Sequence, residues 1–505
     1  MKKGKQLVAL VCVVCLLCSL VVGCTTPTVT TPTGSAQNTS TAPTTGTQTA
    51  TKPTESATTP TTNPTEPTTQ PTEPTQPTQP PTQPTQPPTQ PTQPPTQPTQ
   101  PPTQPTQPPT EPTEPPTEPT EPPTEPPTEL NGSSSTDISA STMTKEEQIA
   151  MYQKIATGEA AWLASLQIEN GALLMTRGPS GTFTMNPYFA DFAALALLGA
   201  GESYYENVRR YMDWHFAHLN TAQTDYNGVD GTIYDYTVTL SNGVMVSEQI
   251  SINANGQKSY DSTDSYAATF LCVVAKYYEK TGDLDYLQAH SQDLQRVLNP
   301  IRQTMHSGLT FAKPDYRIKY LMDNCEVYEG LVAAEKIYAA LGLSELCAEA
   351  TDLKNQVFEA IETHMWVAAG GYYEVALGVN NDSAYAFTWS NFYPCATAQL
   401  FPISCGLLEP TDPRAIHLYN QFNVYYSTGE QRSTWEKMTI PDSFYWGSLA
   451  YTAALMGDNA RLESYMTLYL KVMNRHAYPL YNADAARVCM AAQLMLEKLE
   501  QGGNK

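Results

Sequence analysis

The chain has 505 residues and a formal net charge of −22, and its composition divides it into two unlike parts. Of its 42 prolines, 32 lie before Asn131, whereas all 30 Tyr, 12 Phe and 6 Trp residues follow that position. A stretch of 130 residues without an aromatic side chain cannot build a hydrophobic core. The remainder carries 24 basic and 41 acidic residues, a net charge of −17, which would repel a phosphate backbone. We therefore expect one large globular domain and no nucleic-acid partner.

The first residues have the pattern of an export signal. Three lysines precede an apolar run over residues 7–22, and this run leads into Val-Val-Gly-Cys, which ends at Cys24. The run is short for a membrane-spanning helix, and a small residue precedes the expected cut. The ending resembles the bacterial lipobox, which implies that the cysteine receives a diacylglycerol anchor. We expect residues 1–23 to be a lipoprotein signal peptide and Cys24 to be lipidated, with ordinary secretion as the alternative.

Residues 24–135 follow as a Thr/Pro-rich segment that settles into Pro-Thr-Gln and Pro-Thr-Glu repeats. Proline fixes φ and removes a backbone donor, so the segment favours solvated polyproline II and is predicted to be a disordered linker. At about 3.1 Å per residue it could extend on the order of 300 Å. We expect an exported bacterial protein at the extracellular face of the cell membrane, in contact with the membrane only through its lipid anchor.

Residues 136–505 read as an all-α domain of twelve helices in six consecutive pairs. The first helix of each pair has one apolar stripe, as surface helices do: Lys145–Leu166, Glu202–Leu219, Leu284–Met305, Ser344–Trp366, Pro413–Asn423 and Asp458–Arg475. The second is apolar nearly all round, as buried helices are: Pro187–Leu198, Asp261–Tyr278, Tyr320–Leu341, Asn391–Phe401, Ser443–Met456 and Asn482–Leu496. Six repeated pairs with buried second members favour closure into a double ring.

This pattern resembles the six-hairpin glycosidase superfamily, whose members are (α/α)6 toroids. Two segments resemble the acidic openings of inner helices in such enzymes, DSTDSYAATFL at 261–271 and LMDNCEVYEGL at 321–331. The resemblance implies a carbohydrate groove at the N-terminal ends of the inner helices. It also implies acid/base hydrolysis of glycosidic bonds, commonly with inversion. We expect a carbohydrate as the partner and a monomer as the assembly.

One connection, residues 220–260, is too long to serve only as a connection. Residues 233–240 alternate apolar and polar side chains and are followed by Asn242-Gly243 and a second apolar run. This predicts a β-hairpin with an Asn-Gly turn, which we expect to form one wall of the groove. Acidic residues of the same connection lack the spacing of a calcium loop and are expected to be solvated: Asp225, Asp230 and Asp235.

The strongest candidates for catalysis are two pairs of acids, Asp261 with Asp264 and Asp323 with Glu326. A single acid at a helix start is explained by capping, but two acids three residues apart share a helix face. Crowding raises one pKa, as a general acid requires, and inverting hydrolysis needs one protonated and one ionised carboxyl. We predict Asp264 and Glu326 as the catalytic pair, with Glu326 preferred as the acid. Asp261 and Asp323 are predicted to position substrate or tune pKa values.

Aromatic residues near helix openings supply ring faces that could stack on sugars. The predicted substrate-binding residues are Tyr188, Tyr266, Trp389, Trp435 and Trp446, together with Asp442. No metal is expected, because the seven histidines are scattered without a His-Glu-x-x-His pattern. No cofactor is expected either, because phosphate-binding glycine loops do not occur. The six cysteines after the linker have no CxxC spacing and are expected to be free thiols.

Two other functions remain open from the sequence. A polysaccharide lyase on the same ring would need basic or phenolic groups near an acidic sugar, for which Tyr236, Arg317 and Lys319 are available. A non-catalytic glycan-binding or wall-associated lipoprotein would keep the ring without the chemistry.

Overall fold

The computed structural model describes residues 143–427, 434–442, 444–476 and 480–502. The predicted signal peptide, Cys24 and the Thr/Pro-rich linker lie outside the described residues. Among the helices that the structure describes, every one is too short or too polar to cross a membrane.

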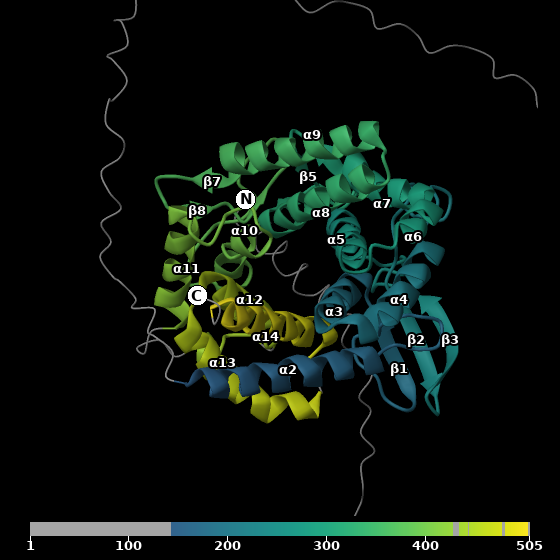
Figure 1. Ribbon diagram of the computed structural model, residues 1–505. Coiled ribbons are helices and arrows are strands. Elements are labelled where there is room, and N and C mark those ends of the chain that lie inside the picture. The colour runs from purple at the N-terminus through teal and green to yellow at the C-terminus, as the bar shows by residue number, and fades with distance from the viewer. Residues whose placement is uncertain (1–142, 428–433, 443, 477–479, 503–505) are drawn as a thin grey trace, which may run out of the picture. The chain divides into compact units, whose positions relative to one another are not determined.

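Helices that are apolar on most sides form a closed inner ring in the described part of the chain (Figure 1). Each packs against the next, and the last packs against the first. In ring order they are α3 (Pro187–Ala200), α5 (Asp264–Thr281), α8 (Leu321–Ala340), α10 (Phe401–Ser404), α12 (Gly447–Met456) and α14 (Asn482–Gly502).

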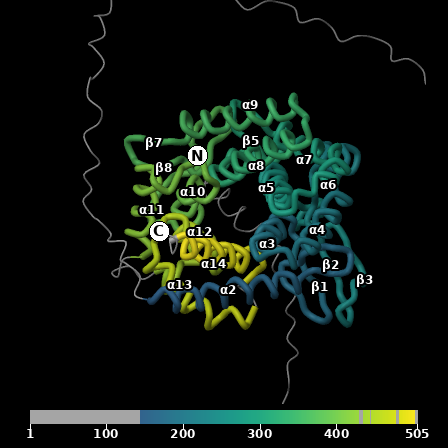
Figure 2. The backbone as a smooth tube through the Cα atoms, in the orientation of Figure 1, coloured from purple at the N-terminus to yellow at the C-terminus, as the bar shows by residue number. Residues whose placement is uncertain are grey.

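Helices with one apolar stripe lie outside this ring: α2 (Lys145–Ser165), α4 (Tyr205–Ala217), α6 (Leu284–Ala289), α7 (Ser291–Thr304), α9 (Ser344–Ala360), α11 (Pro413–Tyr426) and α13 (Asn459–Val472). Helix α2 packs on α3 and α14, α4 on α3 and α5, α7 on α5, α9 on α8, and α13 on α12. The chain therefore closes on itself where its first and last described helices lie side by side (Figure 2). The all-α toroid of six helical hairpins is confirmed.

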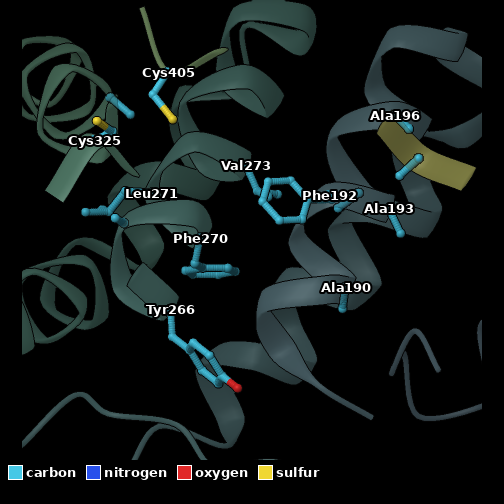
Figure 3. Close-up of a cluster of buried hydrophobic side chains, with 14 of the residues drawn as sticks. Ala190, Phe192, Ala193, Ala196, Tyr266, Phe270, Leu271, Val273, Cys325 and Cys405 are labelled. Carbon is cyan, nitrogen blue, oxygen red and sulfur yellow. The ribbon is translucent and has the colours of Figure 1, made fainter. Parts of the chain in front are cut away.

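Small residues set the spacing of the inner ring. In the core between α3 and α5, alanines of α3 alternate with large apolar side chains, and Phe192 reaches toward Val273 (Figure 3). Helices α5 and α8 approach closely, and a Cβ built on Gly330 would lie 2.5 Å from the Cα of Ala268. Each of these two residues lies one turn after an acidic residue, Asp264 on α5 and Glu326 on α8. The glycine contact thus holds the openings of the two helices together.

The fourth inner helix differs from its prediction. Instead of one helix over 391–401, a single π-type turn at Phe392–Ala396 is followed by the short α10. The reason is two prolines, Pro394 and Pro402, which lack the backbone donor that a continuous helix needs. Helix α5 also begins at Asp264 rather than at Asp261, so the first acid of that pair lies in the preceding loop.

The predicted hairpin is present as β2 (Tyr236–Ser241) and β3 (Val244–Ile250), which pair antiparallel. Asn242 and Gly243 at the turn have φ of 52° and 81°, the left-handed values that an Asn-Gly hairpin turn uses. A third strand that the sequence analysis did not predict, β1 (Gly181–Met185), pairs with β2. The remaining strands form two-residue pairs: β4 (Met305–His306) with β5 (Leu309–Thr310), β6 (Lys319–Tyr320) with β9 (Ala376–Leu377), and β7 (Trp366–Val367) with β8 (Tyr372–Tyr373).

The six cysteines of the domain are free thiols, as predicted. Four of them are buried, among them Cys325 on α8 and Cys405 after α10 (Figure 3). Burial raises the pKa of both thiols well above the usual value, so they pack as small apolar side chains.

Candidate active site

The N-terminal ends of α3, α5 and α8 meet at one end of the ring. Near the start of α3, the Tyr188 hydroxyl donates a hydrogen bond of 2.5 Å to Oε1 of Glu326 on α8. The Tyr188 ring stacks on Tyr266 of α5, with centroids 6.0 Å apart and planes 17° apart. Because helix N-termini carry positive partial charge, this end of the ring favours acidic groups. The two predicted acid pairs are brought together here.

Asp264 is completely buried, although it was predicted to be catalytic. Its Oδ2 accepts a 2.6 Å hydrogen bond from the Thr310 hydroxyl, and its Oδ1 accepts one of 2.9 Å from the Ser265 backbone. Burial raises the pKa of Asp264 to about 7, and these hydrogen bonds lower it only in part. With no solvent contact and both oxygens bonded, Asp264 does not reach a substrate in this conformation.

Glu326 is also nearly buried, with 3% of its surface exposed. Burial raises the pKa of this carboxyl to about 7, against the lowering effect of the Tyr188 hydrogen bond. Its position directly behind Tyr188 makes it a supporting group for the surface of the site rather than a part of that surface.

Asp323 and Asp261 are the members of the two pairs that face solvent. Asp323 is partly exposed, and its pKa is raised well above the usual value by burial first, then by Asp264, Glu326 and Asp261. Asp261 is exposed, yet burial among surrounding atoms still raises its pKa, while Lys313 lowers it. Both carboxyls therefore touch solvent, while the atoms around them oppose their ionisation.

A further acid in the site was expected to be a solvated loop residue. Asp235, just before β2, accepts hydrogen bonds at Oδ1 from the Asn186 amide at 2.9 Å and the Tyr266 hydroxyl at 3.0 Å. Burial and then the neighbouring Asp261 raise the pKa of Asp235 to about 7, against the lowering effect of these two hydrogen bonds. The expectation was wrong because the long connection folds back over the openings of α3 and α5, which local spacing could not indicate.

The other two aspartates of this connection are structural. Asp225 is buried and accepts hydrogen bonds from the Thr232 hydroxyl and the Tyr260 hydroxyl at 2.9 and 3.0 Å. Asp230 pairs with Arg296 of α7 at 3.1 Å. Among the described residues, no three His, Cys, Asp or Glu side chains are grouped so that they could hold a metal ion.

One arginine lies among the inner helices behind the acids. The Arg487 guanidinium of α14 lies 4.1 Å from the ring centre of Phe192 on α3 and 5.2 Å from that of Tyr451 on α12. Its charge lowers the pKa values of Glu326 and Glu329. Arg487 therefore partly offsets the negative charge on α8 and bridges three helices of the ring.

A second acidic group lies where α12 and α14 begin. Asp484 accepts a 3.0 Å hydrogen bond from the Gly447 backbone, and burial raises its pKa to about 7, with a further contribution from Asp442. Trp446, directly before α12, has φ 52° and ψ 58°, a conformation that costs free energy for a residue with a side chain. Asp442 and Trp446 are both partly exposed, and their role as substrate-binding residues stays a prediction.

The remaining aromatic predictions separate by burial. Trp435 is 1% exposed and donates to Oδ1 of Asn423 at 2.9 Å, so its predicted stacking on a sugar is wrong, because the core covers both faces of its ring. Trp389 is partly exposed but packs on Phe387 and on Tyr425 of the outer helix α11. Tyr266 is 3% exposed, so it contributes its hydroxyl to the Asp235 network rather than a free ring face. Tyr188 remains partly exposed.

No protein-family model and no curated protein sequence matches the chain. Among solved structures, a protein titled as a wild-type glycosidase is 13% identical over 70% of this chain and 100% of its own, with a TM-score of 0.48. An alpha-amylase from Clostridium perfringens is 11% identical over 67% of this chain and 98% of its own, with a TM-score of 0.44. A mannosylglycerate hydrolase from Thermus thermophilus is 13% identical over 67% of this chain and 99% of its own, with a TM-score of 0.42. At this level of similarity, the roles of residues rest on contacts within this chain.

Proposed function

We propose that the protein is a glycoside hydrolase that cleaves a poly- or oligosaccharide at the N-terminal end of its inner helix ring. The observation that carries this proposal is the pair Asp323 and Asp261. Both carboxyls face solvent: Asp323 lies on α8, and Asp261 lies in the loop before α5. Burial raises the pKa of both, but neighbouring carboxyls raise that of Asp323 further, whereas a lysine lowers that of Asp261. Glycosidic cleavage needs one carboxyl that keeps its proton and one that has lost it.

Asp323 is the group suited to act as general acid. Burial and then the carboxyls behind it, Asp264 and Glu326, raise its pKa, so that it holds a proton for the oxygen of the leaving sugar. Asp261 is suited to act as general base: burial raises its pKa, but Lys313 lowers it, and Asp261 is the more exposed carboxyl of the two. An ionised Asp261 would take a proton from the water that attacks the anomeric carbon, and the product would have inverted configuration.

This assignment reverses the roles predicted from the sequence. There, Asp264 and Glu326 were the catalytic pair, and the solvent-facing members of the two pairs were supporting groups. The pair Asp264 and Glu326 stays a prediction, but the burial of both side chains favours a supporting role. Tyr188 and Trp446, which are partly exposed near the two acidic groups, are the rings best placed to contact a sugar.

The lyase alternative finds less support. Lys319 is completely buried, and its pKa is lowered by desolvation. Tyr236 is buried in β2 with its ring against Trp214, and burial raises its pKa, which disfavours the phenolate that a lyase base needs. A non-catalytic glycan-binding protein would use the same site, and activity measurements separate it from a hydrolase.

The proposal is tested by incubating the full-length protein with a panel of polysaccharides and oligosaccharides and measuring new reducing ends. On a substrate that is cleaved, Asp323→Asn and Asp261→Asn should each lower kcat by about 10²- to 10⁴-fold, because each removes a proton-transfer group. The control is Asp285→Asn on the outer helix α6, which should keep full activity.

Proton NMR of the first product should show the anomer opposite to that of the substrate. Full activity of both site variants, or an unsaturated product that absorbs in the ultraviolet, would refute the hydrolase mechanism. Loss of activity in Asp264→Asn and Glu326→Gln alone would return the catalytic roles to the buried pair.

A further inference from the structure

The connection between α4 and α5 places a carboxyl at the openings of two inner helices. Asn186, which caps α3 by accepting from the Phe189 backbone at 2.9 Å, donates to Asp235 and also to the Tyr266 oxygen at 2.7 Å. Tyr266 in turn donates to Asp235 at 3.0 Å. The result is a closed triangle of hydrogen bonds that joins α3, α5 and the connection.

The backbone of Asp235 is held as firmly as its side chain. Its N–H donates to the Ser259 carbonyl, and its carbonyl accepts from the Ser251 N–H, both at 2.8 Å. The preceding residue, Tyr234, is fully buried and stacks on Tyr260, with ring centres 5.2 Å apart. A side chain fixed in this way is preorganised and loses little conformational freedom when it binds a ligand.

In the part of the chain that the structure describes, only one carboxylate oxygen of Asp235 takes part in hydrogen bonds. Oδ1 accepts both side-chain hydrogen bonds, whereas Oδ2 has no hydrogen-bond partner among the described residues. Asp235 is partly exposed, and Oδ2 is not among the buried atoms that lack a partner, so this oxygen meets solvent. The Asp261 backbone N–H lies 3.4 Å from the Tyr266 hydroxyl, which places Asp235 next to the proposed general base.

We propose that Asp235 is a specificity-determining residue whose free Oδ2 accepts a hydrogen bond from a hydroxyl of the bound sugar. This inference rests on the proposed function and adds a requirement for substrate structure: the sugar beside Asp261 carries a hydroxyl that faces the connection. A site built to bond such a hydroxyl rejects an analogue that lacks it, because the acceptor would be left without a partner.

The test measures binding without turnover. The measurement is calorimetry in the Asp323→Asn background with an oligosaccharide that the wild type cleaves, at about pH 8, where Asp235 is mostly ionised. Asp235→Ala should raise Kd by about 10- to 100-fold, the loss of one hydrogen bond to a charged acceptor. The matched control is Asp230→Asn on the same connection, which pairs with Arg296 away from the site and should leave Kd unchanged.

Monodeoxy analogues of the oligosaccharide identify the hydroxyl. One analogue should bind equally weakly to the proteins with and without Asp235, whereas the others should still lose affinity in Asp235→Ala. Unchanged Kd in Asp235→Ala, or an equal loss with every analogue, would refute the role of Asp235 while hydrolysis by the wild type stands. If no glycan binds or is cleaved, the proposed function fails, and this inference fails with it.

Discussion

At the scale of residues, burial divides the acids of the site into two roles. Asp261 and Asp323 meet solvent, whereas Asp264 and Glu326 lie behind them with hydrogen bonds from Thr310 and Tyr188. The buried acids raise the pKa of Asp323, so the four groups act as one electrostatic unit. The spacing of acids along the sequence indicates that these four carboxyls lie close together. It cannot show which of them is exposed, because the exposure of each depends on where its helix begins.

Asp264 makes stability depend on pH. Its pKa is about 7 in the folded protein and about 4 in an unfolded chain, so the folded state binds more protons between these values. Below about pH 4, the group is protonated in both states and does not change the free energy of unfolding. From about pH 4 to about pH 7 it lowers the free energy of unfolding progressively, and above about pH 7 this loss is constant. Asp235, Glu326 and Asp484, whose pKa values are also raised to about 7, act in the same direction.

We therefore expect the domain to lose stability as the pH rises from about 5 to about 8. The variant Asp264→Asn, which cannot ionise, should reduce this loss by about 1 kcal/mol or more. Urea unfolding curves at the two pH values measure both quantities. An identical pH dependence in the variant and the wild type would contradict the raised pKa of Asp264.

At the scale of elements, one glycine sets the position of the two helices that carry these acids. Gly330 of α8 meets the backbone of Ala268 on α5, one turn beyond Glu326 and Asp264. Because the contact involves backbone atoms, a methyl group at this position would push the helices apart.

The variant Gly330→Ala should lower the free energy of unfolding by about 1–3 kcal/mol and reduce activity by separating Asp323 from Asp261. Gly199→Ala on α3 is the matched control, because its methyl group meets only the end of the Gln493 side chain, which can move. Chemical denaturation and hydrolysis assays measure the two effects. Equal behaviour of the two variants would show that the close approach of α5 and α8 is not limiting.

At the scale of the whole molecule, the ring is closed by contacts between its two ends. The Gln148 amide of α2 donates to Glu463 of α13 at 2.6 Å, and Glu159 of α2 pairs with His476 at 3.1 Å. These polar contacts reinforce the packing of α2 on α14, so the start and the end of the domain depend on each other.

Attachment to the cell surface is a proposal that rests on the sequence around Cys24, which lies outside the described residues. We propose that a lipid on Cys24 tethers the helical domain through the Thr/Pro-rich segment. Labelled palmitate should enter the protein expressed in a bacterial host and be absent from Cys24→Ala. Cys18→Ala, which lies within the signal, should keep the label, and incorporation into Cys24→Ala would refute the anchor.

The sequence by itself determined the class of fold and indicated four of the candidate acids. Repeated pairs of striped and fully apolar helices can bury their surfaces in a closed ring, and Asn242-Gly243 specifies its hairpin turn locally. These features depend on neighbours in the chain, so periodicity and turn chemistry report them. Even here, Pro394 and Pro402 interrupt the fourth inner helix.

Only the tertiary structure decided which groups face the site. Trp435 is buried in the core, and Asp264 is buried with a hydrogen bond from Thr310. Asp235 lies in the site because the long connection before α5 places it there. The physical reason is that exposure and pKa depend on atoms from several helices, which are distant in sequence and adjacent only after the ring has closed.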